Sequence, residues 1–263
     1  MQRDRSRPFQ ARKRFGQHFL HDRNVINKIL LAIDPQPHDV LVEIGPGMGA
    51  ITLPLLERCG ALTAVELDRD VIPALQAAAK DKGDLRLIQA DALKTDFHTL
   101  TPEGCKLRLV GNLPYNISTP LLFHCLDQID VIADMHFMLQ KEVVQRMAAQ
   151  PGSKDYGRLT VMLAVRCRVE PLLNIGAGAF KPPPRVESAF VRLIPYAQAP
   201  FPLGDTARFK TLVNQAFSRR RKTLRNALLG LVDESAIRRA GLDPAVRPET
   251  LSAADYAHLA DGI

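Results

Sequence analysis

The sequence has few cysteines and no long apolar run, and both shortages exclude classes of protein. The four cysteines are widely spaced and form no Cys-x-x-Cys pair: Cys59, Cys105, Cys125 and Cys167. They offer neither a disulfide framework nor a zinc site. No apolar stretch approaches the roughly 20 residues of a membrane span, and the N-terminus has no apolar segment of the kind found in secretion signals. We therefore expect a cytoplasmic protein with no membrane segment and no metal.

Negative charge is the scarcer sign. There are 28 Asp and Glu residues against 35 Lys and Arg, which gives a net charge of +7 over 263 residues. The excess gathers before residue 15 and again at Arg219, Arg220, Arg221 and Lys222. A solvated helix face would explain either cluster alone, but two clusters favour a polyanionic partner such as nucleic acid.

Apolar runs and helical patterns alternate along the first 200 residues. Five runs are typical of buried strands: 40–44, 62–65, 85–88, 107–110 and 135–139. Two more, 161–169 and 189–194, have no obvious helix between them and are predicted to pair as a hairpin at the sheet edge. The alternation predicts an α/β fold with a doubly wound, mainly parallel, seven-stranded Rossmann-like sheet.

The pattern changes after Pro195. A proline-rich linker, 200–202, is followed from Asp205 by short helical stretches that continue to the C-terminus. We predict three parts: a basic N-terminal arm over residues 1–21, an α/β domain over residues 22–199, and a small helical domain over residues 200–263.

A glycine-rich turn, Gly45-Pro46-Gly47-Met48-Gly49, follows the first predicted strand, where ligands bind in open α/β sheets. The spacing resembles the dinucleotide fingerprint, so a nicotinamide dehydrogenase has to be weighed. Glu66 comes 21 residues after Gly45, at the end of the second strand. A carboxylate there can accept both ribose hydroxyl protons, which suits NAD and S-adenosylmethionine equally.

Asp91 follows the third strand, where its carboxylate can accept a hydrogen bond from an adenine amine. This favours the sulfonium cofactor, although Asp91 could also cap the stretch that begins at Ala92. After the fourth strand come Asn112, Leu113, Pro114 and Tyr115.

An adenine N6 nitrogen is a poor nucleophile because its lone pair is delocalised into the ring. The Asn112 side-chain oxygen and the Pro114 carbonyl would accept its two hydrogens and direct the lone pair at a methyl group. Tyr115 offers a flat face to an extruded base. The structural alternative is a plain strand-end turn.

In combination, these motifs make the chain similar to the KsgA/RsmA-type small-subunit ribosomal RNA adenine dimethyltransferases, which are relatives of the Erm methylases. The resemblance covers nearly the whole length. The segments that carry it are 15–20 (FGQHFL), 43–49 (EIGPGMG), 66–68 (ELD), 89–92 (QADA), 111–116 (GNLPYN) and 180–186 (FKPPPRV).

The resemblance implies S-adenosylmethionine as the cofactor. The residues that it places against the cofactor are Gln17, His18, Leu20, Gly45, Gly47, Glu66, Asp91 and Asn112. His18 stands where many members carry Asn, and both side chains can hydrogen-bond a carboxylate. The residues that would hold and stack on the target adenine are Asn112, Leu113, Pro114, Tyr115 and Phe180.

The resemblance also implies a substrate: two adjacent adenosines in a hairpin loop near the 3′ end of 16S ribosomal RNA, or of the 30S particle. Arg219, Arg220, Arg221 and Lys222 would contact RNA phosphates. We expect a monomer with a role in small-subunit biogenesis.

Three alternatives remain open. The first is an RNA-binding ribosome-assembly factor that does not depend on catalysis. The second is a nicotinamide oxidoreductase, for which no hydride-transfer constellation is visible. The third is a mitochondrial transcription-factor relative whose arginine-rich start is removed on import, although Asp4 and the absence of an amphipathic pattern argue against a transit peptide.

Overall fold

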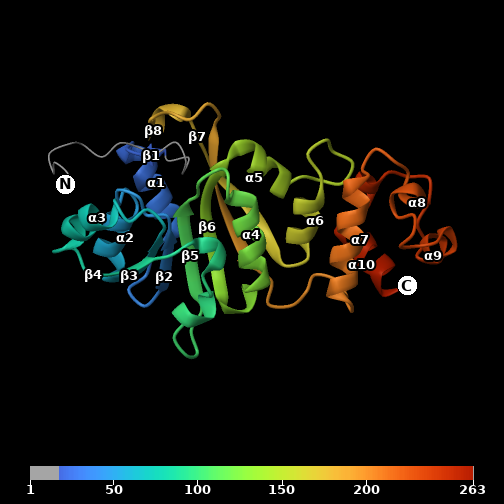
Figure 1. The fold of residues 1–263 in the computed structure, drawn as a ribbon, viewed down its shortest axis with the longest axis horizontal. Coiled ribbons are helices and arrows are strands. Elements are labelled where there is room, and N and C mark those ends of the chain that lie inside the picture. The colour runs from blue at the N-terminus through green and yellow to red at the C-terminus, as the bar shows by residue number, and fades with distance from the viewer. Residues whose placement is uncertain (1–17, 263) are drawn as a thin grey trace, which may run out of the picture. The chain divides into compact units, whose positions relative to one another are not determined.

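The computed structural model describes residues 18–262. Its main feature is a seven-stranded sheet with the order β4-β3-β2-β5-β6-β9-β7 (Figure 1). The strands are β2 (Val40–Ile44), β3 (Ala61–Glu66), β4 (Asp84–Gln89), β5 (Leu107–Asn112), β6 (Ile132–Gln140), β7 (Cys167–Ile175) and β9 (Ser188–Pro195). The five strands from β4 to β6 pair in parallel. The predicted α/β class and mainly parallel seven-stranded sheet are therefore confirmed. A second sheet joins the short strands β1 (Phe19–Leu20) and β8 (Phe180–Lys181).

The helices follow the predicted alternation up to β6. The α-helices are α1 (Arg23–Ile33), α2 (Thr52–Cys59), α3 (Ile72–Ala79), α4 (Ser118–Asp127), α5 (Lys141–Met147), α6 (Arg158–Ala164), α7 (Thr206–Ser218), α8 (Leu224–Ala227), α9 (Glu234–Arg239) and α10 (Ala253–Asp261). Short 3₁₀ turns are η2 (Ala92–Lys94), η3 (Phe97–Leu100), η4 (Ile129–Val131), η5 (Ala177–Ala179) and η6 (Pro248–Thr250). Asp22 caps α1, because its carboxylate accepts the N–H groups of Asn24 and Val25 at 2.8 and 3.1 Å. None of the described helices is long and apolar enough to cross a membrane.

One predicted strand is wrong in its first half. Within the run 161–169, the residues up to Ala164 form α6, and β7 begins only at Cys167. A continuous apolar run does not distinguish a buried helix from a buried strand. Here the Thr160 hydroxyl accepts the N–H of Gly157 at 3.1 Å, which helps begin the helix. The second half of the prediction is confirmed, since β7 is an edge strand beside β9.

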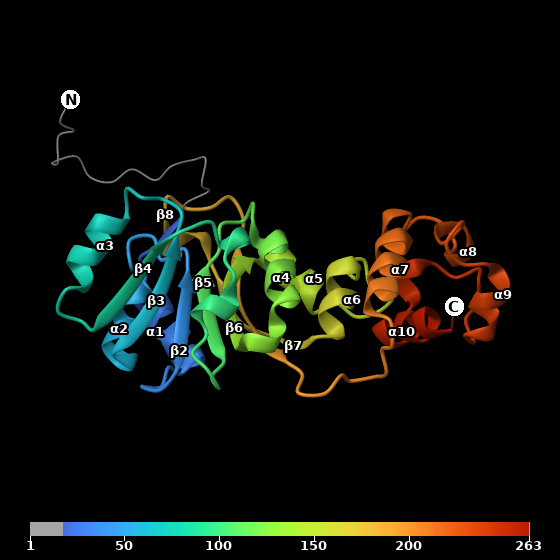
Figure 2. The same ribbon diagram turned by 60° about the horizontal axis from the view of Figure 1, so that its bottom comes forward.

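The chain divides into two compact units, and their limits differ from a single domain boundary near residue 200. The first unit runs up to Lys141 and includes Pro171–Arg192, and the second contains Glu142–Glu170 and the chain from Leu193 onward. In the second unit, α7 packs against α6, α8 and α10, and α7 to α10 are drawn in orange and red in Figure 2. The apolar face of α7 is buried at Phe209, Leu212, Val213 and Ala216. The domain limits 22–199 and 200–263 remain a prediction.

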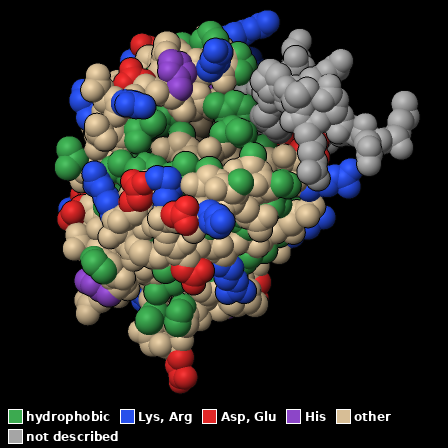
Figure 3. Space-filling model, turned by 90° about the vertical axis from the view of Figure 1, so that its left-hand side faces the viewer, with side chains coloured by type: hydrophobic (Ala, Val, Ile, Leu, Met, Phe, Trp, Pro, Cys, Tyr) green, Lys and Arg blue, Asp and Glu red, His purple; other side chains and the backbone are tan. Residues whose placement is uncertain are grey.

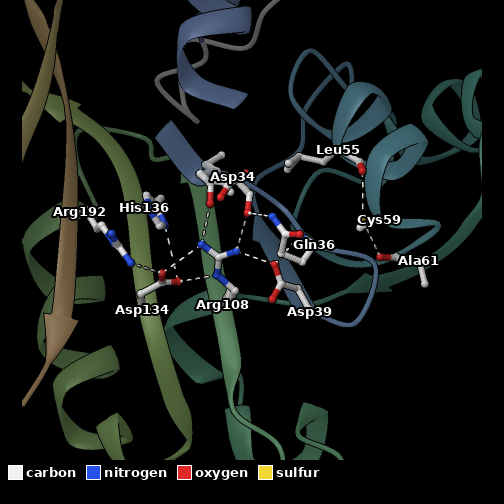
Figure 4. A network of polar contacts seen from close by, with 11 residues as sticks. Asp34, Gln36, Asp39, Leu55, Cys59, Ala61, Arg108, Asp134, His136 and Arg192 are labelled. Carbon is white, nitrogen blue, oxygen red and sulfur yellow. Dashed lines mark hydrogen bonds and ion pairs between the residues drawn. The ribbon is translucent and has the colours of Figure 1, made fainter. Parts of the chain in front are cut away.

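A buried ion network holds β5 in place (Figure 4). The Arg108 guanidinium donates to both carboxylate oxygens of Asp134 on β6, at 3.0 and 3.1 Å. It also donates to the Ile33 carbonyl at the end of α1, at 2.6 Å, and pairs with Asp39. Arg192 on β9 donates to the same Asp134 at 3.2 Å. Arg108 lies near the start of β5, so this network fixes the strand whose other end delivers Asn112.

Candidate active site

The carboxyl ends of the parallel strands meet at one pocket. Its lining includes residues after β2, β3, β4 and β5, together with the short strand β1. All of the sequence-predicted cofactor residues that the structure describes contribute to this lining: His18, Leu20, Gly45, Gly47, Glu66, Asp91 and Asn112. Leu113, Pro114 and Tyr115 line the same pocket. Gln17 lies outside the described residues.

The glycine turn presents backbone N–H groups to the neighbouring strand end. Gly45, Gly47 and Gly49 have φ values of +68°, +53° and +85°, which side-chain-bearing residues rarely adopt. A Cβ atom on Gly47 would also lie 3.1 Å from the Phe19 ring. The Gly47 N–H donates to Glu66 Oε2 at 3.1 Å, and the Asp68 N–H donates to Oε1 at 2.8 Å. Burial raises the pKa of Glu66, and these N–H groups oppose that rise by stabilising the carboxylate.

Glu43 is a pocket residue that the sequence analysis did not assign. It is 2% exposed, and its Oε2 has no hydrogen-bond partner within the described part of the chain. Burial raises the pKa of Glu43 to about 8. The available signal was an acidic residue inside the otherwise apolar run 40–44.

Asp91 caps the 3₁₀ turn that follows it, which was the alternative role considered from the sequence. Its Oδ1 accepts the N–H of Leu93 at 3.0 Å and so caps η2. A carboxylate has a second oxygen, so capping by one oxygen does not remove the capacity to accept a hydrogen bond from an adenine amine.

Asn112 is oriented by the backbone of His18, the residue directly before β1. Its side-chain nitrogen donates to the His18 carbonyl oxygen at 3.0 Å. The oxygen of the same amide is directed away from that carbonyl and is the accepting end of the group.

Tyr115 is held on two sides. Its hydroxyl shares a 2.7 Å hydrogen bond with the hydroxyl of Ser188, a fully buried residue at the start of β9. Its ring stacks against the His18 imidazole, with centroids 5.8 Å apart and planes inclined by 28°. His18 Nδ1 lies 2.8 Å from the Pro182 carbonyl, which can only accept, so Nδ1 donates. Ser188 was not predicted from the sequence, because nothing in its local pattern points to Tyr115.

The Pro114 carbonyl oxygen is engaged at the start of α4. It accepts the Ile117 N–H at 3.1 Å. The Ser118 hydroxyl lies 3.2 Å from it and 3.1 Å from the Tyr115 carbonyl oxygen, and its one hydrogen can be directed at either. A carbonyl oxygen has two lone pairs, so the role of Pro114 as an acceptor for the target amine remains a prediction.

The charge of the pocket tests whether a cofactor fits. The Glu66 and Asp91 carboxylates line it together with Glu43, whose raised pKa favours its protonated form, and no Lys or Arg of the described residues does. S-adenosylmethionine carries a sulfonium and an ammonium group, and such a lining suits it. A dinucleotide would place a pyrophosphate there, where the carboxylates would repel it. The residues present thus fit the sulfonium cofactor and disfavour the oxidoreductase alternative.

A family model described as ribosomal RNA adenine dimethylase matches residues 8–263. The chain belongs to this family. It is 57% identical over 246 residues to the ribosomal RNA small subunit methyltransferase A of Nitrosococcus oceani, covering 94% of this chain and 93% of that protein. The corresponding protein of Pseudomonas putida is 54% identical over 251 residues, covering 95% and 94%.

Solved structures agree with this membership. A dimethyladenosine transferase from Plasmodium falciparum superimposes with a TM-score of 0.79 at 25% identity, over 92% of this chain and 96% of that one. The 23S rRNA methyltransferase ErmE gives a TM-score of 0.70, also at 25% identity, over 93% and 98%. The predicted relation to Erm methylases is therefore confirmed at the level of structure.

Phe180 is the predicted target residue that lies apart from the pocket lining. It is 2% exposed and belongs to the core cluster formed with α1 and α2. Its backbone pairs with Leu20, which joins β8 to β1. Its stacking on the target base remains a prediction.

The basic run Arg219, Arg220, Arg221 and Lys222 forms the turn after α7 in the second unit. It lines a surface hollow with Phe217, Asn226 and Leu229. Arg220 donates to the Ser153 carbonyl at 3.2 Å and lies 3.8 Å from Glu249. Arg220 therefore has a structural role in addition to the predicted phosphate contact.

Proposed function

We propose that this protein transfers methyl groups from S-adenosylmethionine to the N6 atoms of adenosines in small-subunit ribosomal RNA. Its substrate is two adjacent adenosines in a hairpin loop near the 3′ end of 16S RNA, and each receives two methyl groups. The observation that carries the proposal is the oriented Asn112 amide in one pocket with the Glu66 and Asp91 carboxylates. Family membership and the identity to small-subunit methyltransferases support the RNA assignment.

The cofactor supplies an electrophilic methyl group on its sulfonium. In the proposed arrangement Glu66 accepts hydrogen bonds from the ribose hydroxyls and Asp91 accepts one from the adenine amine. Glu43 lines the same pocket, and His18 and Leu20 cover the methionine end. Gln17 is proposed to act with them, on the strength of the family motif alone.

The target amine is held by acceptors. Asn112 Oδ1 accepts a hydrogen bond from the amine, and the nitrogen lone pair is then directed at the methyl group. The second acceptor is the Pro114 carbonyl oxygen, which has two lone pairs and accepts the Ile117 N–H with one of them. Positioning of this kind suits a displacement that needs alignment more than a strong base. The amine proton leaves to water.

The target base stacks on Tyr115, whose ring is fixed by Ser188 and His18. Bases in loops are unpaired and can be extruded at lower cost than bases in a duplex. Phe180 is proposed as the second stacking face.

The wider RNA contact is electrostatic. On the face in Figure 3, Lys and Arg side chains are interspersed with Asp and Glu, so that face gathers no single sign of charge. The run Arg219–Lys222 consists of consecutive cationic residues, and we propose that it contacts RNA phosphates. We propose that the protein acts in the cytoplasm as a monomer, on RNA or on a partly assembled 30S particle, and contributes to small-subunit biogenesis.

Labelled methyl transfer to small subunits that lack adenine dimethylation tests the reaction. Recovery of N6,N6-dimethyladenosine in the 3′ region supports the proposal, and absence of label on particles that the protein binds contradicts it. In that case the assembly-factor alternative applies. Binding of S-adenosylhomocysteine but not of NAD would separate the methyltransferase and the assembly factor from an oxidoreductase.

A further inference from the structure

Helix α4 is hydrogen-bonded to the segment that carries Asp91. Two side chains at the end of α4, His124 and Gln128, lie four positions apart and therefore share a helix face. His124 Nε2 lies 2.8 Å from the Thr95 carbonyl oxygen, and Gln128 Nε2 lies 3.3 Å from the same oxygen. The Gln128 side-chain oxygen accepts the Phe97 N–H at 2.7 Å.

The hydrogen-bond directions are fixed by chemistry. A carbonyl oxygen can only accept, so His124 carries its proton on Nε2. The Gln128 amide nitrogen is 2.9 Å from that ring nitrogen. Two donors do not bond each other, so both direct their hydrogens at the Thr95 carbonyl. The fully buried Phe97 ring packs against the imidazole, with centroids 5.5 Å apart.

The same segment is tied back to Asp91. The Thr95 hydroxyl donates to the Asp91 backbone carbonyl at 3.0 Å, while the Asp91 side chain caps η2. The path from α4 to the Asp91 carboxylate thus consists of hydrogen bonds and one 3₁₀ turn. None of His124, Gln128 and Thr95 lines the pocket.

We propose that His124 and Gln128 are positioning residues. Through their hydrogen bonds to Thr95, they hold the Asp91 carboxylate where it can bind the adenine of the cofactor. This rests on the proposed function, because it requires that Asp91 binds the adenine amine. Helix α4 begins three residues after Tyr115, and its Ser118 hydroxyl lies 3.1 Å from the Tyr115 carbonyl oxygen and 3.2 Å from that of Pro114, to either of which it can donate. One helix therefore supports both the cofactor adenine and the target adenine.

The test compares two ligands that differ only at the group Asp91 would bind. S-adenosylhomocysteine has the exocyclic amine, and its 6-deamino analogue, with purine in place of adenine, has a hydrogen there and the same unprotonated N1. Calorimetry on the full chain gives the ratio of their affinities. We expect His124→Leu and Thr95→Val to weaken S-adenosylhomocysteine by about threefold to tenfold and to leave the 6-deamino analogue nearly unchanged, so that the ratio falls.

A conservative variant and a control variant separate a positioning role from a nonspecific loss of local structure. His124→Gln keeps a donor near the Nε2 position and should restore the ratio. His98→Leu is the matched control, since His98 bridges Asp96 and Asp130 in the adjoining turn, and it should leave the ratio unchanged. At saturating cofactor, kcat should stay within twofold of the wild type in His124→Leu while the KM for S-adenosylmethionine rises.

The Asp91→Asn variant distinguishes the two possible failures. If Asp91→Asn lowers the ratio while His124→Leu and Thr95→Val do not, the positioning role is wrong and the cofactor assignment survives. If Asp91→Asn leaves the ratio unchanged, the adenine contact itself is wrong, and the inference falls with it. Should His124→Leu fail to fold, Thr95→Val, which removes a single half-buried hydroxyl, decides the matter alone.

Discussion

The side-chain amide nitrogen of Asn112 donates to the backbone carbonyl oxygen of His18 at 3.0 Å, across 94 positions of sequence. This contact determines which end of the amide can accept a hydrogen bond from a substrate. It also joins the end of β5 to the residue directly before β1, a strand whose two residues line the pocket.

Asn112→Asp tests this orientation. Aspartate keeps the acceptors but loses the donor, and it places a carboxylate oxygen against the His18 carbonyl. We expect single-turnover methyl transfer to fall by about 10²-fold, the cost of a misplaced reacting group. His18→Asn is the comparison, since it leaves the backbone carbonyl in place, and its effect should be below tenfold. Wild-type rates in Asn112→Asp would contradict the role of the contact.

Tyr115 and Ser188 should behave as a coupled pair. Tyr115→Phe leaves the fully buried Ser188 hydroxyl without its partner, and Ser188→Ala does the same to the tyrosine hydroxyl. Each single variant should lose about 1 kcal/mol of unfolding free energy. The double variant should lose less than the sum of the two, because the shared bond is removed only once. Urea unfolding of the four proteins measures this, and strict additivity would refute the coupling.

The stacking role of Tyr115 is separable from its hydroxyl. Tyr115→Phe keeps the flat face and should bind RNA nearly as well as the wild type. Tyr115→Ala should weaken RNA binding by about 1–3 kcal/mol, the value of one stacked base. Equal affinities for RNA in the Phe and Ala variants would exclude stacking.

Glu43 should make the free energy of unfolding decrease as the pH rises. Burial raises its pKa from 4.5 to about 8. Between these values the unfolded chain has lost the proton and the folded chain keeps it. Stability therefore falls as the pH rises through this window, by about 1.4 kcal/mol per pH unit from this group alone.

Glu43→Gln removes the titrating group and should flatten that slope. His136 acts in the opposite sense, because burial lowers its pKa from 6.5 to about 4 and its contribution lies below pH 6.5. The comparison is therefore made by urea unfolding between pH 6.5 and 8. Identical slopes in the two proteins would show that Glu43 is not protonated when folded.

The basic turn of the second unit should set the salt dependence of RNA binding. Arg219, Arg221 and Lys222 can be replaced by Gln while Arg220, which contacts Ser153 and Glu249, is kept. The slope of log affinity against log salt should become shallower by about 0.7–0.9 per lost phosphate contact. Arg239→Gln on α9 serves as the control. An unchanged slope would place the RNA elsewhere.

Much of this site follows from sequence, because parallel strands align their carboxyl ends. Glu66, Asp91 and Asn112 could each be placed after an apolar run, and the sheet then brings them to one pocket. Contacts between distant segments were beyond reach, and for that reason Ser188 and the His18 carbonyl were missed. Residues 161–164 were misread because their burial on all sides erases the helical period. The use of the Pro114 carbonyl by α4 depends on where that helix begins, which the sequence defined only within a residue or two.

The most direct measurement uses labelled S-adenosylmethionine and small ribosomal subunits lacking adenine dimethylation, with wild type compared with Asn112→Ala. We predict label in N6,N6-dimethyladenosine near the 3′ end with the wild type, and a loss of about 10²–10³-fold in the variant. Wild-type transfer by Asn112→Ala, or no transfer by a wild type that binds the particles, would contradict the account.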